Sequence, residues 1–173
     1  MKKHDFFLIL RLCVYIFEFF LLYSLEQIPG LNAEICGVRP LVLVPFFVSA
    51  VVFESEIFSL GLGLVCGILV DVSFGTVPGC FMLVLGLIGY FIGIMFKYFI
   101  KINLFSAMIF NFVILSIVCF LKNCFNYSKL GVQNNFYVWN NVFVPIICYS
   151  GVLFVLAYFF NRYIYYKFSE KRG

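Results

Sequence analysis

Six runs of apolar residues, separated by short polar segments, make up most of the chain. The runs lie at Phe6–Leu25, Leu41–Phe53, Ile57–Val72, Cys80–Phe96, Leu104–Leu121 and Val142–Tyr163. Most of them approach the ~20 residues with which an α-helix crosses the hydrocarbon core of a bilayer. The second and third runs are short and are separated only by Glu54-Ser55-Glu56, so one merged span is the alternative to two. The pattern predicts an all-α, polytopic membrane helix bundle.

Composition supports lipid as the main solvent of this chain. Hydrophobic residues make up 64% of its 173 residues and charged residues 12%, whereas soluble domains are nearer ~45–50% apolar and ~25% charged. A soluble enzyme, a nucleic-acid-binding domain and a disordered linker are therefore excluded. Residues 1–173 are expected to form a single integral membrane domain. The first run contains Arg11 and Glu18 and is followed by no small-residue cleavage site, so we interpret it as a retained helix.

The distribution of Lys and Arg predicts the orientation of the bundle. Cytoplasmic segments of membrane proteins carry an excess of these residues. A topology of six spans with both termini in the cytoplasm has eight Lys and Arg residues inside and three outside, whereas a topology of five spans reverses this bias. We therefore predict six transmembrane helices with an N-in/C-in topology. The inside set is Lys2, Lys3, Lys97, Lys101, Arg162, Lys167, Lys171 and Arg172, and the outside set is Arg39, Lys122 and Lys129.

Two charged residues fall within the first span. Arg11 lies near its cytoplasmic end, where a long side chain can extend to the lipid headgroups as an anchor. Glu18 lies deeper, and an ionisable group at that depth normally faces protein. Three roles stay open for Glu18: a neutral carboxyl hydrogen-bonded inside the bundle, with Asn111 as one partner; a contact with a partner helix; and transport chemistry.

Small residues mark one face of the third span. Ser59, Gly63, Gly67 and Asp71 recur every four residues, and small residues at this spacing let the backbone of a neighbouring helix approach closely. The fourth span carries small residues as well. We predict tight packing of these two helices through a second set of glycines: Gly86, Gly89 and Gly93.

Asp71 ends this stripe at the outer membrane boundary, where a carboxylate needs partners. Loop N–H groups, the N-terminus of the fourth helix and Arg39 are the three candidates. Gly75, Pro78 and Gly79 follow, and they predict a turn with unusual backbone dihedrals.

The sequence has few residues that could carry catalysis or hold a metal. The single histidine, His4, precedes the first span, and no catalytic triad, HExxH motif or P-loop is present. The seven cysteines form no CxxC motif, and a thiol in an apolar run behaves as a small hydrophobe. We expect no enzymatic activity, no cofactor and no metal. A disulfide among Cys36, Cys80 and Cys124 stays open if their loops face an oxidising compartment.

A series of motifs surrounds the third span. Arg39-Pro40 opens the second span, Gly63-x-x-x-Gly67-x-x-x-Asp71 follows, and Gly75-Thr76-x-x-Gly79 precedes a span with Tyr90. This series resembles the MreD family of bacterial rod shape-determining membrane proteins. Gln27-Ile28-Pro29 and Pro145 also fit the family, as do the length and the number of spans. Glu18 and the cysteines are not part of the pattern.

This resemblance implies a function that composition cannot give. MreD-like proteins are non-enzymatic scaffold subunits of the cell-elongation complex in the bacterial inner (cytoplasmic) membrane, where they support lateral peptidoglycan synthesis. They pair with MreC, whose single membrane helix docks on the bundle, and so join MreB, RodA and a class B penicillin-binding transpeptidase. Their fold is thought to be similar to the substrate-binding subunits of energy-coupling-factor transporters. A substrate-binding subunit of a vitamin-type transporter is therefore the alternative, although the first span lacks the alanine stripe typical of those subunits.

Overall fold

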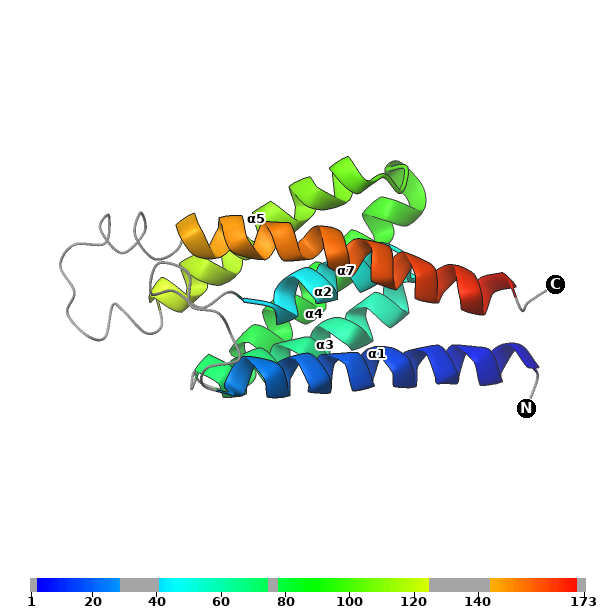
Figure 1. The fold of residues 1–173 in the computed structure, drawn as a ribbon, viewed down its shortest axis with the longest axis horizontal. Helices are drawn as coiled ribbons and strands as arrows, with labels where there is room; N and C mark the ends of the chain where they lie inside the picture. The colour runs from blue at the N-terminus through cyan, green and yellow to red at the C-terminus, as the bar shows by residue number, and fades with distance from the viewer. Residues whose placement is uncertain (1–2, 29–40, 75–77, 125–143, 171–173) are drawn as a thin grey trace.

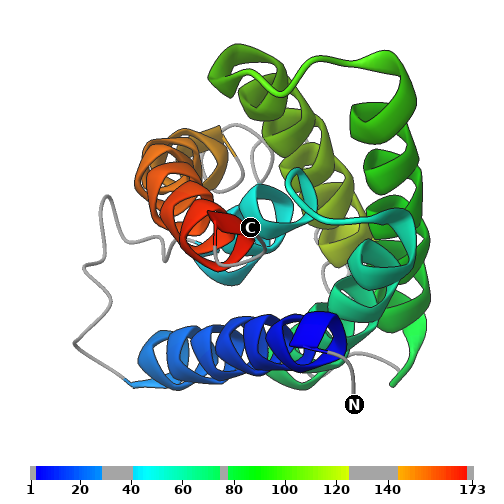
Figure 2. The same ribbon diagram turned by 90° about the vertical axis from the view of Figure 1, so that its right-hand side faces the viewer.

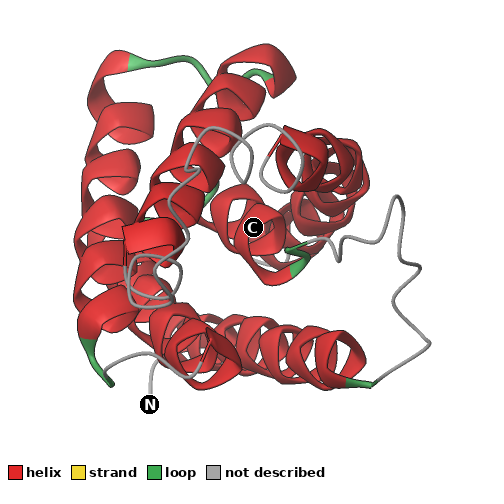
Figure 3. Ribbon diagram, turned by 90° about the vertical axis from the view of Figure 1, so that its left-hand side faces the viewer, coloured by secondary structure: helices red, strands yellow, loops and turns green. Residues whose placement is uncertain are grey.

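The structure, a computed structural model, describes residues 3–28, 41–74, 78–124 and 144–170 (Figure 1). The regular secondary structure of this part of the chain is helical, and it contains no strand (Figure 3). The elements are α1 (Lys3–Gln27), α2 (Leu43–Val51), α3 (Glu56–Phe74), α4 (Cys80–Ile94), the π-helical turn η1 (Met95–Phe99), α5 (Leu104–Lys122) and α7 (Val144–Glu170).

The helices run up and down along one long axis. Helices α1, α3 and α5 run in one direction, and α2, α4 and α7 run in the other (Figure 1). The start of α1, the turn between α2 and α3, the connection between η1 and α5, and the end of α7 therefore lie at one end, which we call the N/C end. The opposite end holds the end of α1, the start of α4 and the end of α5.

The second helix is shorter than the run Leu41–Phe53 predicted. Nine helical residues rise only about 14 Å, which is less than half of the ~30 Å hydrocarbon core. Eight of the nine residues are buried, and α2 lies in the middle of the bundle (Figure 2). The predicted second membrane span is thus not a full transmembrane helix. Two separate helices, rather than one merged span, do occupy this region.

The outer surface of the bundle suits lipid. The helices α3, α4 with η1, α5 and α7 are each long and apolar enough to cross a membrane. At 25 residues, α1 is about 37 Å long. Large apolar side chains point outward: Phe105 is 75% exposed, Leu83 68% and Val152 66%. Exposed apolar surface of this extent is rare on soluble monomers.

Helices α3 and α4 touch through their backbones. A Cβ atom added at Gly63 would collide with the carbonyl oxygen of Leu85, and one added at Gly67 would collide with the Cα of Met82. A Cβ at Gly89 would lie 2.5 Å from the Ser59 carbonyl oxygen.

The other two glycines of α4 lie on the same contact. Gly93 faces the Cα of Glu56, and Gly86 faces the Leu64 side chain. The Leu64 side chain can move aside, but the backbone atoms that face the other glycines cannot. The spacing of these glycines therefore sets how closely the two helices approach.

Gly61 offers a matched control for this contact. It lies on α3 as well, but a Cβ there meets nothing within 4 Å. We expect Gly63→Ala to lower the free energy of unfolding by about 1–3 kcal/mol, because the added methyl group has no room. Gly61→Ala should be neutral or stabilising, because alanine favours a helix by about 1 kcal/mol. Titration with SDS in mixed micelles, followed by circular dichroism, measures both. Equal free energies of unfolding for Gly63→Ala and Gly61→Ala would contradict the close contact between α3 and α4.

Candidate functional site

A buried ion pair joins α1 to the turn between α2 and α3. Arg11 Nη2 donates a hydrogen bond to Glu54 Oε2 at 2.6 Å, and the two residues are 5% and 6% exposed. The buried Tyr15 lies within electrostatic reach of both charges. Removing two charges from water is costly, so such a pair is retained only where its geometry is good.

Aromatic side chains of α7 pack against this ion pair and against the turn that holds Glu54. Phe53 lies between Tyr158 and Tyr165, with ring centroids at 5.2 Å and 5.7 Å. The Arg11 guanidinium lies 5.2 Å from the centroid of the Tyr165 ring, within range of a cation–π interaction. Arg11 therefore does not reach out as a lipid anchor, as its position in the sequence suggested. It faces inward because the turn at Glu54 folds back toward α1.

Glu18 lies on the wall of an apolar groove between α1 and α7. The groove encloses about 440 Å³, and Phe46 of α2 and Leu156 and Phe160 of α7 also line it. Glu18 is 9% exposed. The Asn161 amide lies near enough to act on its carboxyl group, yet within the described residues neither carboxyl oxygen makes a hydrogen bond of normal geometry.

Asn161 itself is held by α2. Its Nδ2 donates to Ser49 Oγ at 2.5 Å and approaches the Phe46 carbonyl oxygen at 3.4 Å. The expected pairing of Glu18 with Asn111 is not found. Asn111 is fully buried on α5, and its amide has no hydrogen-bond partner among the described residues.

Asp71 fixes the start of α4 at the opposite end of the bundle. Its carboxylate accepts the backbone N–H groups of Gly79 at 3.0 Å, Phe81 at 3.1 Å and Met82 at 3.1 Å. These N–H groups have no partner inside the helix, and the N-terminus of a helix attracts negative charge. Gly79 has φ = 98°, a left-handed conformation that glycine adopts without strain. Of the predicted partners of Asp71, the helix terminus is therefore present.

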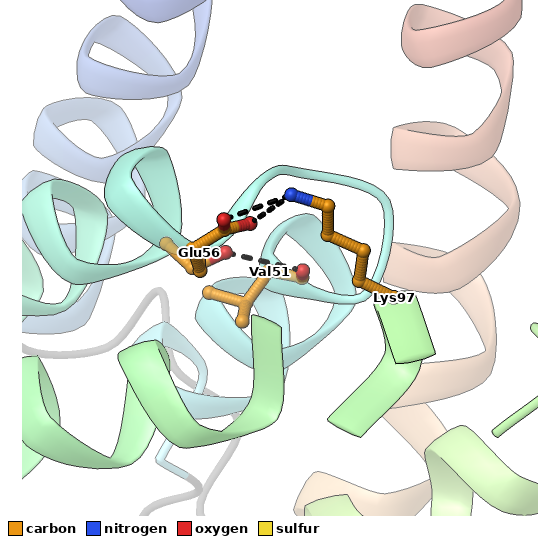
Figure 4. A network of polar contacts seen from close by, with 4 residues as sticks. Val51, Glu56 and Lys97 are labelled. Atoms are coloured by element: carbon orange, nitrogen blue, oxygen red, sulfur yellow. Dashed lines mark hydrogen bonds and ion pairs between the residues drawn. The ribbon is translucent and has the colours of Figure 1, made fainter. Parts of the chain in front are cut away.

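A second carboxylate ties the same two helices together at the N/C end. Glu56, at the start of α3, accepts two hydrogen bonds of 2.8 Å from Lys97 Nζ in η1 (Figure 4). Nearby, Ser59 Oγ donates to the Val51 carbonyl oxygen at 3.4 Å. The α3–α4 hairpin thus has a carboxylate contact at each end.

Several predicted residues lie outside the described part of the chain: Arg39, Pro40, Gly75 and Cys36. The proposed Arg39–Asp71 pair therefore has no structural account here. Cys80 and Cys124 are free thiols. Among the described residues no three His, Cys, Asp or Glu side chains lie close enough together to hold a metal ion.

The roles of Glu54 and Asn161 were not predicted. A weak signal for Glu54 exists, because it has the opposite charge to Arg11 at the same predicted membrane boundary. Asn161 is a polar residue within the last apolar run, which predicts burial but not its partner.

Comparison with known proteins assigns the family. The family model described as rod shape-determining protein MreD matches residues 7–168. The chain belongs to the MreD family. No curated protein and no solved structure matches the chain significantly. Membership gives the protein a role in the determination of rod shape and identifies it as a membrane protein. The match extends from α1 to α7, so it includes both the Arg11–Glu54 pair and the α3–α4 hairpin.

The Arg11–Glu54 pair can be tested with a double-mutant cycle. Arg11→Met and Glu54→Leu should each lower the free energy of unfolding by about 3–5 kcal/mol, because each leaves one buried charge without its partner. The double variant should recover much of this loss, because two apolar side chains need no partner. SDS titration measures all three variants.

Lys97→Met, at the exposed ion pair, is the control and should change stability little. Additive losses in the double variant would show that the two charges do not interact.

Proposed function

We propose that this protein is a non-enzymatic scaffold subunit of the cell-elongation complex in the bacterial cytoplasmic membrane. It binds an MreC-like single-span protein and, through it, supports MreB, RodA and a class B penicillin-binding transpeptidase in lateral peptidoglycan synthesis. The match of residues 7–168 to the MreD family carries the proposal. The lipid-compatible outer surface of the bundle supports the membrane location.

The proposed topology has six passes, with the N/C end in the cytoplasm. Because α1 and α3 run in the same direction (Figure 1), the chain returns between them, and α2 makes this return as a short helix shielded from lipid. Lys97, Lys101, Arg162 and Lys167 belong to the N/C end, and Lys122 to the opposite end. This bias supports a cytoplasmic location of the N/C end.

The use of polar side chains favours a scaffold over a catalyst. Asp71 contacts the backbone of α4, and Arg11 contacts Glu54. Asn161 joins α7 to α2. Each of these groups fixes one helix against another, as expected of a protein that presents a shaped surface to its partners.

Complementation of a rod-shaped bacterium that lacks its own MreD-family gene tests this function. We expect expression of this chain, together with its own MreC-like partner, to restore the rod shape and normal cell width. Gly63→Ala should restore the width less well, because it disturbs the α3–α4 contact, and Gly61→Ala should restore it fully. Cell width by phase-contrast microscopy and protein amount by immunoblot are the readouts.

A different outcome would favour the transporter alternative. Round cells despite normal accumulation, together with tight binding of a vitamin by the purified chain, would contradict the scaffold proposal.

Labelling of single cysteines tests the proposed topology. With all other cysteines replaced, native Cys124 at the opposite end should react with a membrane-impermeant maleimide in cells with a permeabilised outer membrane. A cysteine introduced as Ile102→Cys, in the connection at the N/C end, should react only after lysis. The reverse pattern would contradict the orientation.

A further inference from the structure

The apolar groove between α1 and α7 extends along α1. Its α1 wall is formed by Val14, Phe17, Glu18, Leu21 and Leu22, at positions i, i+3, i+4, i+7 and i+8, which form one face of a helix. From the first to the last of these the wall rises about 12 Å. The groove is therefore elongated parallel to α1.

The rim of the groove is open toward the lipid side of the bundle. Phe17 is 69% exposed, Leu156 65% and Phe160 52%, whereas Glu18 lies deeper and is 9% exposed. In Figure 2, α1 and α7 lie at different heights, with α2 between and behind them. A molecule that enters the groove from the membrane would contact the large apolar side chains first and the Glu18 carboxyl group next.

In the proposed topology, in which α1 crosses the bilayer, Glu18 lies near the middle of the membrane. It is three residues from Tyr15, the midpoint of α1, and so about 4.5 Å from the helix centre. Lipid headgroups begin about 15 Å from the bilayer centre, and an acyl chain has no hydrogen-bond donor. Lipid would therefore add no donor to the nearby Asn161 amide, which makes no hydrogen bond of normal geometry to this carboxyl group, and an incompletely satisfied carboxyl group is costly in hydrocarbon.

A transmembrane helix can supply what lipid cannot. It is elongated like the groove, presents apolar side chains to the rim, and can carry a donor side chain at mid-depth. Hydrogen bonds between polar side chains are an established source of helix association in membranes. The elongated apolar groove and the carboxyl group on its wall are complementary to such a helix.

We propose that the α1–α7 groove is a docking site for a transmembrane helix of a partner protein, and that a donor side chain of that helix hydrogen-bonds to Glu18. The donor is an amide, hydroxyl, ammonium or guanidinium group near the middle of the partner's membrane segment. The inference rests on the proposed function for the existence of a membrane partner, and it assigns that partner a surface and a polar contact.

Photo-crosslinking in cells tests the docking site. Benzoylphenylalanine replaces Phe17 or Phe160 at the rim, or Phe105 on the exposed face of α5 as a control, in the full-length chain in the complementation strain. We expect adducts from both rim positions with the membrane segment of the MreC-like partner, or of another subunit of the complex, located by mass spectrometry. That segment should contain a donor side chain near its middle, and the Phe105 position should give no such adduct.

Three variants test whether the adducts depend on the groove. Glu18→Leu should lower the yield of rim adducts about fivefold or more, because it removes the hydrogen-bond acceptor. Glu18→Gln keeps an acceptor, so its yield of rim adducts should be at least about half of that with Glu18. Leu156→Trp changes an exposed rim residue, keeps Glu18, and should lower the adducts by filling the groove. It serves as the deciding variant if Glu18→Leu fails to accumulate.

Adducts with lipid alone, with a second copy of this chain, or equally from Phe105 would overturn the docking site, as would adducts that survive Leu156→Trp. Restored cell width without rim adducts would refute the docking site and leave the proposed function intact. Failure to restore cell width would count against the function itself.

Discussion

Contact between the backbones of α3 and α4 is the constraint on which the rest of the bundle depends. In lipid no hydrophobic force draws helices together, so close packing and polar contacts must do so. Gly63 and Gly67 bring α3 against the backbone of α4, Asp71 holds the first N–H groups of α4, and Glu56 contacts Lys97 at the other end. The glycines and Asp71 thereby fix the hairpin, the exposed Glu56–Lys97 pair adds little, and the other helices pack against a defined surface.

The short helix α2 explains why the remaining polar contacts lie where they do. A nine-residue helix at the centre of a membrane bundle cannot reach both surfaces, so its ends must be satisfied by neighbouring helices. Asn161 and Ser49 join its middle to α7, and the Arg11–Glu54 pair holds the turn that follows it. The Arg11–Glu54 pair is therefore located where the chain departs from full-length helices.

The sequence was enough to predict the helical class, the family and the face of α3 that meets α4, because each depends on local composition and spacing. The glycines recur at a helical period, and Asp71 precedes a turn whose N–H groups lie nearby in the chain. The length of α2 could not be predicted, because a helix buried on all sides and a membrane-spanning helix are equally apolar. The pairing of Arg11 with Glu54 joins positions 43 residues apart, and it depends on which helices are neighbours. The same limit explains why Asn111, which the sequence offered as one partner of Glu18, does not contact it.

The most direct test of the central role of the α3–α4 hairpin compares the carboxylates at its two ends. Asp71 is 4% exposed and accepts three backbone hydrogen bonds, whereas the side chains of Lys97 and Glu56 are 44% and 22% exposed. The free energy of unfolding in mixed micelles should fall by about 2–4 kcal/mol in Asp71→Ala, because the N–H groups at the start of α4 lose a charged acceptor. Glu56→Ala should stay close to the wild type. An Asp71→Ala protein as stable as Glu56→Ala, with α4 intact, would contradict the account.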